Sequence, residues 1–266
     1  MRNMMRGLVR PTLHVGLSPE AVEMATFDWR GRLVRQGRFP AAPAQTGWQG
    51  AMASFREQLR GDDWSASAAE VILSSHFLRQ HLLPGDTNIG GAAEQGQYMR
   101  HVFRGEYGAA VDGWRIATDR GGRGTRLACA MDAALFDDIV ATCRAARIRP
   151  RSVLPNLVAA ANRNRRQVRQ SDAWFAVLES DICALALLES GRWRHVACAR
   201  LGASGGASLF GLLRQQEMLC NAAPSSRTVY VCGATHGVME ADDARSWKVE
   251  LLARAGGAAR SHLLPC

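Results

Sequence analysis

One short motif in the sequence has the residue types and spacing of a catalytic serine. Gly202-Ala203-Ser204-Gly205-Gly206 matches G-x-S-x-G, with an expected strand before it and an expected helix after it. In hydrolases this sharp turn lifts the serine above a sheet, where an acid and a histidine activate it as a nucleophile. Asp242 or Asp243, then His262, follow in the required order. A serine hydrolase that uses Ser204 is therefore one open alternative.

The rest of the chain favours a plain Gly/Ser loop at this motif. The 62 residues after Ser204 are too few for the remaining strands and helices of a hydrolase sheet. His262 lies four residues from the end of the sequence, where chains are least ordered. Short motifs of this kind also match by chance.

Other signatures of catalysis are missing or have a simpler interpretation. Lys248 is the only lysine, so the sequence has no P-loop, and there is no G-x-G-x-x-G for a dinucleotide. The acid pairs stand at expected turns or helix starts, as capping residues do, and these pairs are Asp62-Asp63, Asp137-Asp138 and Asp242-Asp243. His76, in an apolar run, is interpreted as a core or edge histidine.

Composition indicates a soluble, cytoplasmic protein. Seven cysteines, an odd number without a C-x-x-C pair, predict thiols in a reducing compartment and no zinc site. No run approaches the ~20 apolar residues of a membrane-spanning helix. The start of the sequence lacks the apolar stretch of a secretory signal.

Basic charge is concentrated in one part of the chain. The formal net charge is +9, and residues 139–171 contain eight arginines and no acid. Such a block can bind an acidic partner, anionic lipid headgroups or phosphate, or it can be a solvated helix face. Aromatic residues are not interleaved with these arginines, so no nucleic acid is expected as a partner.

Hydrophobic patterns predict an α/β chain with a weak internal repeat. Each half opens with a three-strand meander and proceeds to helices and further strands; the predicted elements include strands at 12–16, 20–27, 32–39, 70–78, 174–178, 182–188, 193–201, 228–232 and 247–252 and helices at 46–59, 92–103, 134–147 and 209–220. We expect a basic N-terminal arm at residues 1–11, a first lobe at 12–168 and a shorter second lobe at 169–266.

This order of elements resembles the actin-like proteins of pilus and secretion machinery, namely PilM of type IV pili, the L protein of type II secretion and MshI-type pilus biogenesis proteins. The resemblance spans most of the chain and rests on four passages, Leu13–Ser18, Asp132–Ala160, Trp174–Gly202 and Val229–Gly233. It implies a two-lobed actin-like fold, a ribonuclease H-like repeat with mixed sheets and flanking helices.

The resemblance also locates the nucleotide chemistry and shows what has changed in it. In active members, two hairpins built around Asp-x-Gly present a carboxylate to Mg²⁺ and backbone N–H groups to phosphate. Here the first acid position falls on His14, the second falls on Val177 or Glu179 in a hairpin without glycine, and the adenosine loop keeps Gly233 and Gly237. If nucleotide binding is retained, Gly16, Ser18, Glu179 and Gly233 would line a cleft between the lobes. An ATP-binding switch is thus the second alternative.

We therefore expect a degenerate member of this family that is neither an enzyme nor dependent on a cofactor or metal. It would be a cytoplasmic scaffold, peripheral to the inner membrane, that binds the short cytoplasmic tail of a membrane assembly protein. A motor ATPase is the second candidate partner. The residues expected to contact the partner or an anionic surface are Arg144, Arg147, Arg163, Arg165, Arg166 and Arg169.

Overall fold

The computed structural model describes residues 11–28, 30–43, 47–61, 64–84, 91–118, 125–168, 172–201, 208–222, 224, 226–233 and 247–252. These residues form two compact units. Unit 1 contains the described residues up to Phe77 together with Ala133–Pro155, and unit 2 contains Leu78–Asp132 and the described residues from Asn156 onward. Unit 2 thus draws on both predicted lobes, and the division at residues 168 and 169 stays a prediction.

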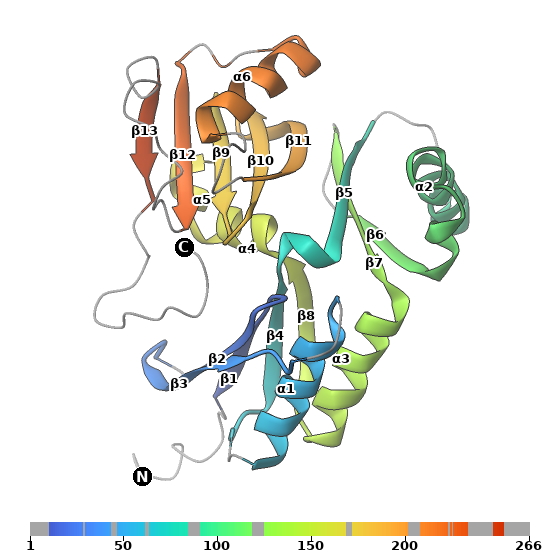
Figure 1. The fold of residues 1–266 in the computed structure, drawn as a ribbon, viewed down its shortest axis with the longest axis vertical. Coiled ribbons are helices and arrows are strands. Elements are labelled where there is room, and N and C mark those ends of the chain that lie inside the picture. Colours follow the sequence, from blue (N-terminus) through green and yellow to red (C-terminus); the bar gives the residue numbers. More distant parts are fainter. Residues whose placement is uncertain are drawn as a thin grey trace. The chain divides into compact units, whose positions relative to one another are not determined.

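Unit 1 is a five-stranded mixed sheet with two helices on one face (Figure 1). The strand order is β3-β2-β1-β4-β8, in which β1, β2 and β3 are antiparallel and β1, β4 and β8 are parallel. Its elements are β1 (Thr12–Leu17), β2 (Ala21–Phe27), β3 (Leu33–Pro40), α1 (Gln49–Gly61), β4 (Ala68–Leu73), the 3₁₀ turn η2 (Ser75–Phe77), α3 (Ala133–Ala145) and β8 (Arg149–Pro155).

Alternation along β1 decides which face of this sheet carries the helices. Leu13, Val15 and Leu17 are buried, whereas the residues between them are only partly buried. Successive side chains of a strand point to opposite faces, so the apolar set packs toward α1 and α3, and His14 lies on the other face. Each fully buried leucine or valine contributes about 1.5–3 kcal/mol, which strongly disfavours a one-residue shift in register.

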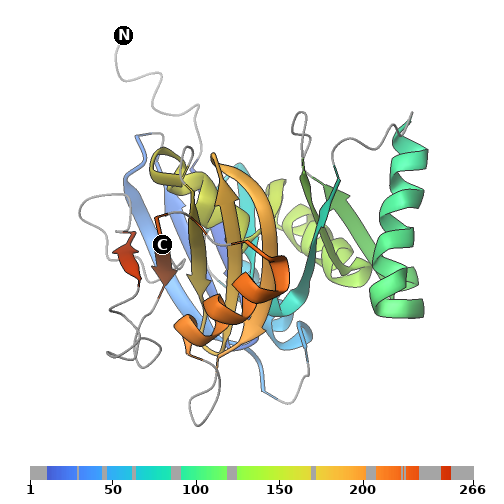
Figure 2. The same ribbon diagram turned by 90° about the horizontal axis from the view of Figure 1, so that it is seen from above.

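The main sheet of unit 2 has the order β11-β10-β9-β12-β13. Helix α6 (Leu209–Cys220) packs on one face, and α4 (Asn156–Arg163) and α5 (Arg165–Val168) lie on the other (Figure 2). Because both faces are covered, the central strands are apolar throughout rather than alternating. The strands are β9 (Ala173–Leu178), β10 (Ile182–Glu189), β11 (Arg192–Arg200), β12 (Thr228–Gly233) and β13 (Lys248–Leu251).

A smaller three-stranded sheet, ordered β5-β7-β6, also belongs to unit 2. One long helix packs on it through the buried side chains of Met99 and Phe103, which contact Leu83 and Ala130 of the sheet. The elements of this part are β5 (Leu78–Leu83), α2 (Ala92–Tyr107), the 3₁₀ helix η3 (Gly108–Gly113), β6 (Trp114–Thr118) and β7 (Arg126–Asp132).

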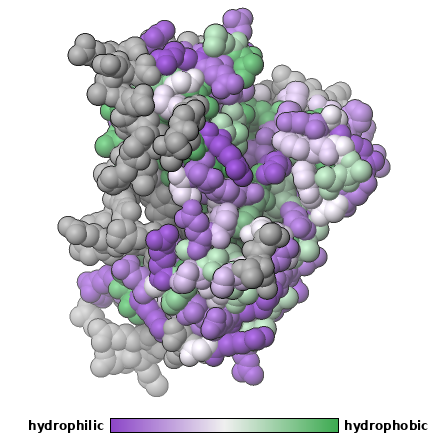
Figure 3. Space-filling model, in the orientation of Figure 1, coloured by the Kyte–Doolittle hydropathy of each residue, from purple (hydrophilic) through white to green (hydrophobic). Residues whose placement is uncertain are grey.

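The two five-stranded sheets have the same topology. Each begins with a three-strand antiparallel meander, and each adds two parallel strands on the side of its first strand. The α/β repeat predicted from the order of elements is therefore confirmed. In the described part of the chain, no helix is long and apolar enough to span a membrane. Figure 3 shows hydrophilic residues over much of the described surface, interrupted by small apolar areas.

The strand predicted at residues 70–78 is two elements, and this prediction was wrong. Strand β4 ends at Leu73, and β5 begins at Leu78 and pairs with β7 in the other unit's small sheet. Between them Ser74 Oγ accepts a hydrogen bond from the His76 N–H at 3.3 Å and lies 2.8 Å from His76 Nδ1. Serine side chains that bond to nearby backbone in this way close a turn within an otherwise apolar run.

The six described cysteines are thiols, and their burial predicts a graded reactivity. Burial raises the pKa of Cys143 to about 11 and also raises that of Cys183, whereas Cys198 is exposed. Because the thiolate is the reactive form, we expect iodoacetamide at pH 8 to alkylate Cys198 and to leave Cys143 and Cys183 unmodified until denaturant is added. Peptide mapping by mass spectrometry checks this, and early alkylation of Cys143 would contradict the packing of α3.

Candidate functional site

The turn between β1 and β2 is the first place where the resemblance locates phosphate. Ser18 N–H donates to the carbonyl oxygen of Ala21 at 3.1 Å, and the Ser18 hydroxyl both donates to that oxygen at 3.0 Å and accepts from Ala21 N–H at 3.1 Å. Pro19 has no N–H, and the exposed Glu20 adds negative charge. The turn therefore offers few free donors to a phosphate and places a repelling carboxylate beside it.

The turn between β9 and β10 closes in the same way. Glu179 N–H donates to the carbonyl oxygen of Ile182 at 2.9 Å, which matches the Ser18–Ala21 bond in unit 1. Ser180 lies between two acids, Glu179 and Asp181, and its hydroxyl is 3.4 Å from an Asp181 carboxylate oxygen. This turn again has no glycine through which backbone could approach a phosphate, and it carries two negative charges.

At the first acid position, the structure places an imidazole that is already paired. His14 on β1 stands in register with Glu70 on β4, and His14 Nδ1 is 3.7 Å from Glu70 Oε2. Arg151 Nη1 on β8 is 3.7 Å from the other oxygen of the same carboxylate, Oε1. The ring of Phe27 meets His14 edge to face at 5.1 Å. A His–Glu–Arg row thus crosses three parallel strands at the position where the resemblance leads us to expect an acid.

Glu70 is the site residue that sequence reasoning missed. It is the third residue of the apolar strand β4, and a lone acid in such a strand is a signal that it has a charged partner. Its carboxylate lies between two basic groups, His14 and Arg151. Among the residues that the structure describes, no group of three or more His, Cys, Asp or Glu side chains could hold a metal ion.

Gly233 ends β12 in a conformation that only glycine adopts readily. Its φ is +107°, and a Cβ atom built on it would lie 2.1 Å from the carbonyl oxygen of Leu178. Gly233 and Leu178 are register partners on β12 and β9. The glycine therefore lets two backbones meet beside the β9–β10 turn, a role that packing alone accounts for.

The four residues expected to line a nucleotide cleft fall into two pairs. Gly16 and Ser18 lie at the end of β1 and in its turn in unit 1, whereas Glu179 and Gly233 lie at adjacent strand ends in unit 2. The structure brings each pair together within its own unit. Several other candidates lie outside the described residues, namely Gly237, Ser204, Asp242, Asp243 and His262.

The predicted arginine surface is divided between the units. Exposed Arg144 and Arg147 end α3 in unit 1, where Arg149 and Arg151 of β8 are exposed as well. In unit 2, Arg163 is half-buried at the end of α4, and Arg165 and Arg166 are exposed on α5. Arg169 lies outside the described residues.

Arg147 adopts a left-handed backbone conformation, with φ at +58°. Its N–H donates to the carbonyl oxygen of Arg144 at 2.9 Å, and Ile148 N–H donates to that of Cys143 at 2.9 Å. These bonds close the end of α3 at a position that glycine usually occupies. Positive charge at this end also suits the helix dipole.

No protein-family model matches the sequence, and no curated protein is significantly similar to it. Solved structures, however, match most of the chain. A Bacteroides thetaiotaomicron protein of unknown function with an actin-like ATPase fold gives a TM-score of 0.62 at 10% identity, over 84% of this chain and 82% of that one. The chain therefore has the actin-like ATPase fold.

Two further neighbours come from bacterial envelope machinery. A chain of the PilM–PilN type IV pilus biogenesis complex gives a TM-score of 0.60 at 13% identity, over 90% of both chains. The cytoplasmic domain of EpsL, an inner membrane component of the type II secretion system of Vibrio cholerae, gives 0.52 at 10% identity, over 83% of this chain and 81% of that one. The resemblance predicted from the sequence is thus confirmed at the level of the fold.

Proposed function

We propose that the chain is a non-catalytic cytoplasmic scaffold of a type IV pilus or type II secretion-like inner-membrane assembly. The neighbours PilM, solved with PilN, and the EpsL cytoplasmic domain support this class of role for the fold. The observation that favours a scaffold over an enzyme is the His14–Glu70–Arg151 row, in which an imidazole stands at the first acid position and two basic groups flank the carboxylate of Glu70. Mg²⁺ takes carboxylate oxygens as ligands, and the imidazole of His14 offers none.

The β1–β2 and β9–β10 turns also favour a scaffold over an enzyme, because they are poorly suited to bind phosphate. Phosphate sites use unengaged backbone N–H groups, often next to glycine. In this chain the Ser18 turn uses its own donors internally, and the turn that contains Glu179 and Asp181 is acidic. Neither the ATP-binding switch nor a cofactor is therefore part of the proposal.

The proposed partner is an inner-membrane assembly protein with a short cytoplasmic tail, and a motor ATPase of the same machine is a second. Arg163, Arg165 and Arg166 give unit 2 a compact basic surface on α4 and α5. Such a surface suits acidic residues of a tail or anionic headgroups of the adjoining membrane. Peripheral membrane contact would follow from the same charges.

The proposal is tested by measuring binding of the immobilised full chain to synthetic cytoplasmic tails of the assembly's inner-membrane proteins. We expect one tail to bind saturably, with an affinity that falls as salt rises, because charged surface contacts are screened. Failure of every tail to bind, at low salt and high concentration, would contradict the scaffold role.

A further inference from the structure

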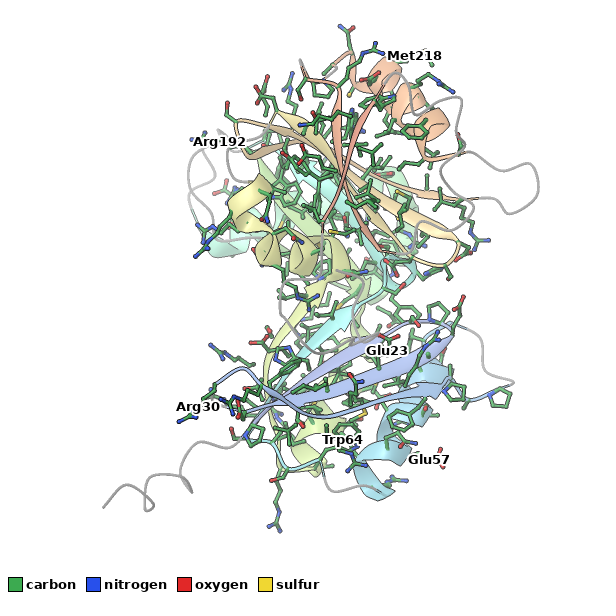
Figure 4. All side chains as sticks on the ribbon, turned by 90° about the vertical axis from the view of Figure 1, so that its left-hand side faces the viewer. Glu23, Arg30, Glu57, Trp64, Arg192 and Met218 are labelled. Atoms are coloured by element: carbon green, nitrogen blue, oxygen red, sulfur yellow. The ribbon has the colours of Figure 1, made fainter. Side chains whose placement is uncertain are left out.

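Strand β3 is an open edge of the unit 1 sheet. It is eight residues long, and among the described residues it pairs with β2 and with no other strand. An edge strand presents unpaired N–H and C=O groups and is a template for the addition of a further strand. Figure 4 looks onto this edge, with Arg30 at the β2–β3 turn and with Glu23 and Trp64 on opposite sides of the sheet.

The hydrogen-bond register tells which β3 residues face outward. Ala41 N–H donates to the carbonyl oxygen of Glu20 at 2.8 Å, so this pair is a hydrogen-bonded one. Hydrogen-bonded pairs alternate along an antiparallel ladder. The backbone N–H and C=O groups that point toward β2 therefore belong to Arg35, Gly37 and Phe39. Gln36 and Arg38 therefore present both N–H and C=O groups to the open edge.

Packing holds this edge in an extended form before any partner arrives. The guanidinium of Arg35 lies over the ring of buried Trp64, 4.4 Å from the ring centroid. The ring of Phe39 meets the Trp64 ring edge to face, with the two centroids 6.3 Å apart. The Phe39 ring also covers Gly37, where an added Cβ would lie 2.5 Å from it. A preformed strand loses little conformational entropy when a partner binds.

Among the other described sheet edges, β11 is longer, with nine residues, but it contacts the edge strand β5 within unit 2. The remaining edges are shorter or better guarded. Strand β8 has Pro150 within it and a register shift against β4, and both features discourage pairing. Strand β13 spans four residues and β6 spans five. Strand β3 has its only proline at its last position, Pro40, and exposes 61% of Val34.

Charge selects the kind of strand that would pair. Four arginines lie on β3 or in the turn before it, namely Arg30, Arg32, Arg35 and Arg38. The acids beside them are engaged, because Asp28 accepts from the N–H groups of Arg30 and Arg32 at 2.8 Å and Glu23 is 3.3 Å from Arg38. Four arginines thus stand beside two acids, and this excess of positive charge makes the edge complementary to acidic residues.

We propose that the β3 edge binds an acidic, extended segment of a partner protein by strand addition. Backbone bonds to Gln36 and Arg38 would supply affinity, and the arginines would select the sequence. This surface goes beyond the scaffold proposal, because it uses none of the arginines of α4 and α5.

The probe is a fluorescein-labelled nonapeptide of alternating glutamate and valine, titrated with the full chain and followed by fluorescence anisotropy. We expect saturable binding that weakens with salt. A peptide of alternating arginine and valine should bind at least tenfold more weakly, because it meets like charge. Equal binding of both peptides, or no binding of the acidic peptide, would overturn the proposal.

Gln36→Pro removes an outward N–H and leaves the β2–β3 ladder intact, as proline on an edge strand does. It should weaken binding of the acidic peptide at least tenfold, whereas Gln36→Thr, which keeps the N–H, should bind as the parent chain does. If Gln36→Pro does not fold by circular dichroism, Arg38→Glu is the second variant, with the same loss expected. Parent-like binding by a folded Gln36→Pro chain would place the peptide elsewhere and overturn the proposal.

A final arm separates this inference from the proposed function. Reversal of Arg163, Arg165 and Arg166 to glutamate should leave binding of the acidic peptide to β3 within about twofold. These arginines belong to unit 2, outside the β3 edge, and charges that do not contact the peptide are screened at physiological salt. A larger loss would mean that the peptide binds at α4 and α5, and this outcome would count against the β3 edge while leaving the scaffold proposal standing.

Discussion

Replacing Gly233 by alanine is expected to lower the free energy of unfolding by about 3–4 kcal/mol, a loss at the upper end of what single substitutions cause. The added Cβ would lie 2.1 Å from the carbonyl oxygen of Leu178, which is backbone and does not move aside as a side chain would. The φ of +107° adds strain for any residue with a Cβ. Urea unfolding monitored by circular dichroism measures the loss.

Gly105→Ala is the matched control for this change. Gly105 is exposed on α2, and an added Cβ would meet nothing within 4 Å. Alanine is the better helix former by about 1 kcal/mol, so this variant should be slightly more stable than the parent chain. A loss of less than about 1 kcal/mol for Gly233→Ala would contradict the close approach of β12 to β9.

Reversing Arg163, Arg165 and Arg166 to glutamate together is expected to weaken binding of the partner tail or of anionic vesicles at least a hundredfold. An arginine near an anionic surface contributes about 1 kcal/mol, and reversal replaces that attraction by repulsion. Arg165 and Arg166 are exposed on α5, and Arg163 is half-buried at the end of α4, so circular dichroism first checks that the variant keeps the fold. Co-sedimentation with vesicles and capture of the tail measure the effect.

A control variant with the same change in charge reverses three exposed arginines of β11 in unit 2, namely Arg192, Arg194 and Arg200. It should bind within a few-fold of the parent chain, because the proposed surface is on α4 and α5. Equal losses in the two variants would show that net charge, and not this surface, attracts the partner. Unchanged binding in the variant of Arg163, Arg165 and Arg166 would show that these three arginines do not bind the partner.

The fold could be predicted because the signal is repeated along the chain. Two meanders, each closed by a four-residue turn, were visible as apolar runs with polar breaks at Ser18 and Glu179. Strand order then follows from short connections and from the tendency of neighbouring strands to pair. The error at residues 70–78 arose because Ser74 and His76 close a turn without the glycine or proline that usually marks one.

The candidate site could be predicted only in part. His14 was located from the sequence. Its partner Glu70 is 56 positions away, and Arg151, which pairs with Glu70, is 137 positions away, so strand pairing alone brings the three into one row. The arginines of residues 139–171 are close together in the sequence, which predicts a single surface. In the structure, however, Arg144 and Arg163 belong to different units. Spacing along the chain reports neighbours on one element, and it does not report which unit an element joins.

Binding of Mg·ATP to the intact chain tests the central claim most directly. A protein that binds a ligand only in its folded state gains about 2.7 kcal/mol at a ligand concentration of one hundred times the Kd, which raises the unfolding midpoint by several degrees. The His14–Glu70–Arg151 row and the acidic turns predict no change in the midpoint at millimolar Mg·ATP. A rise that requires both Mg²⁺ and ATP, and that saturates, would contradict the account.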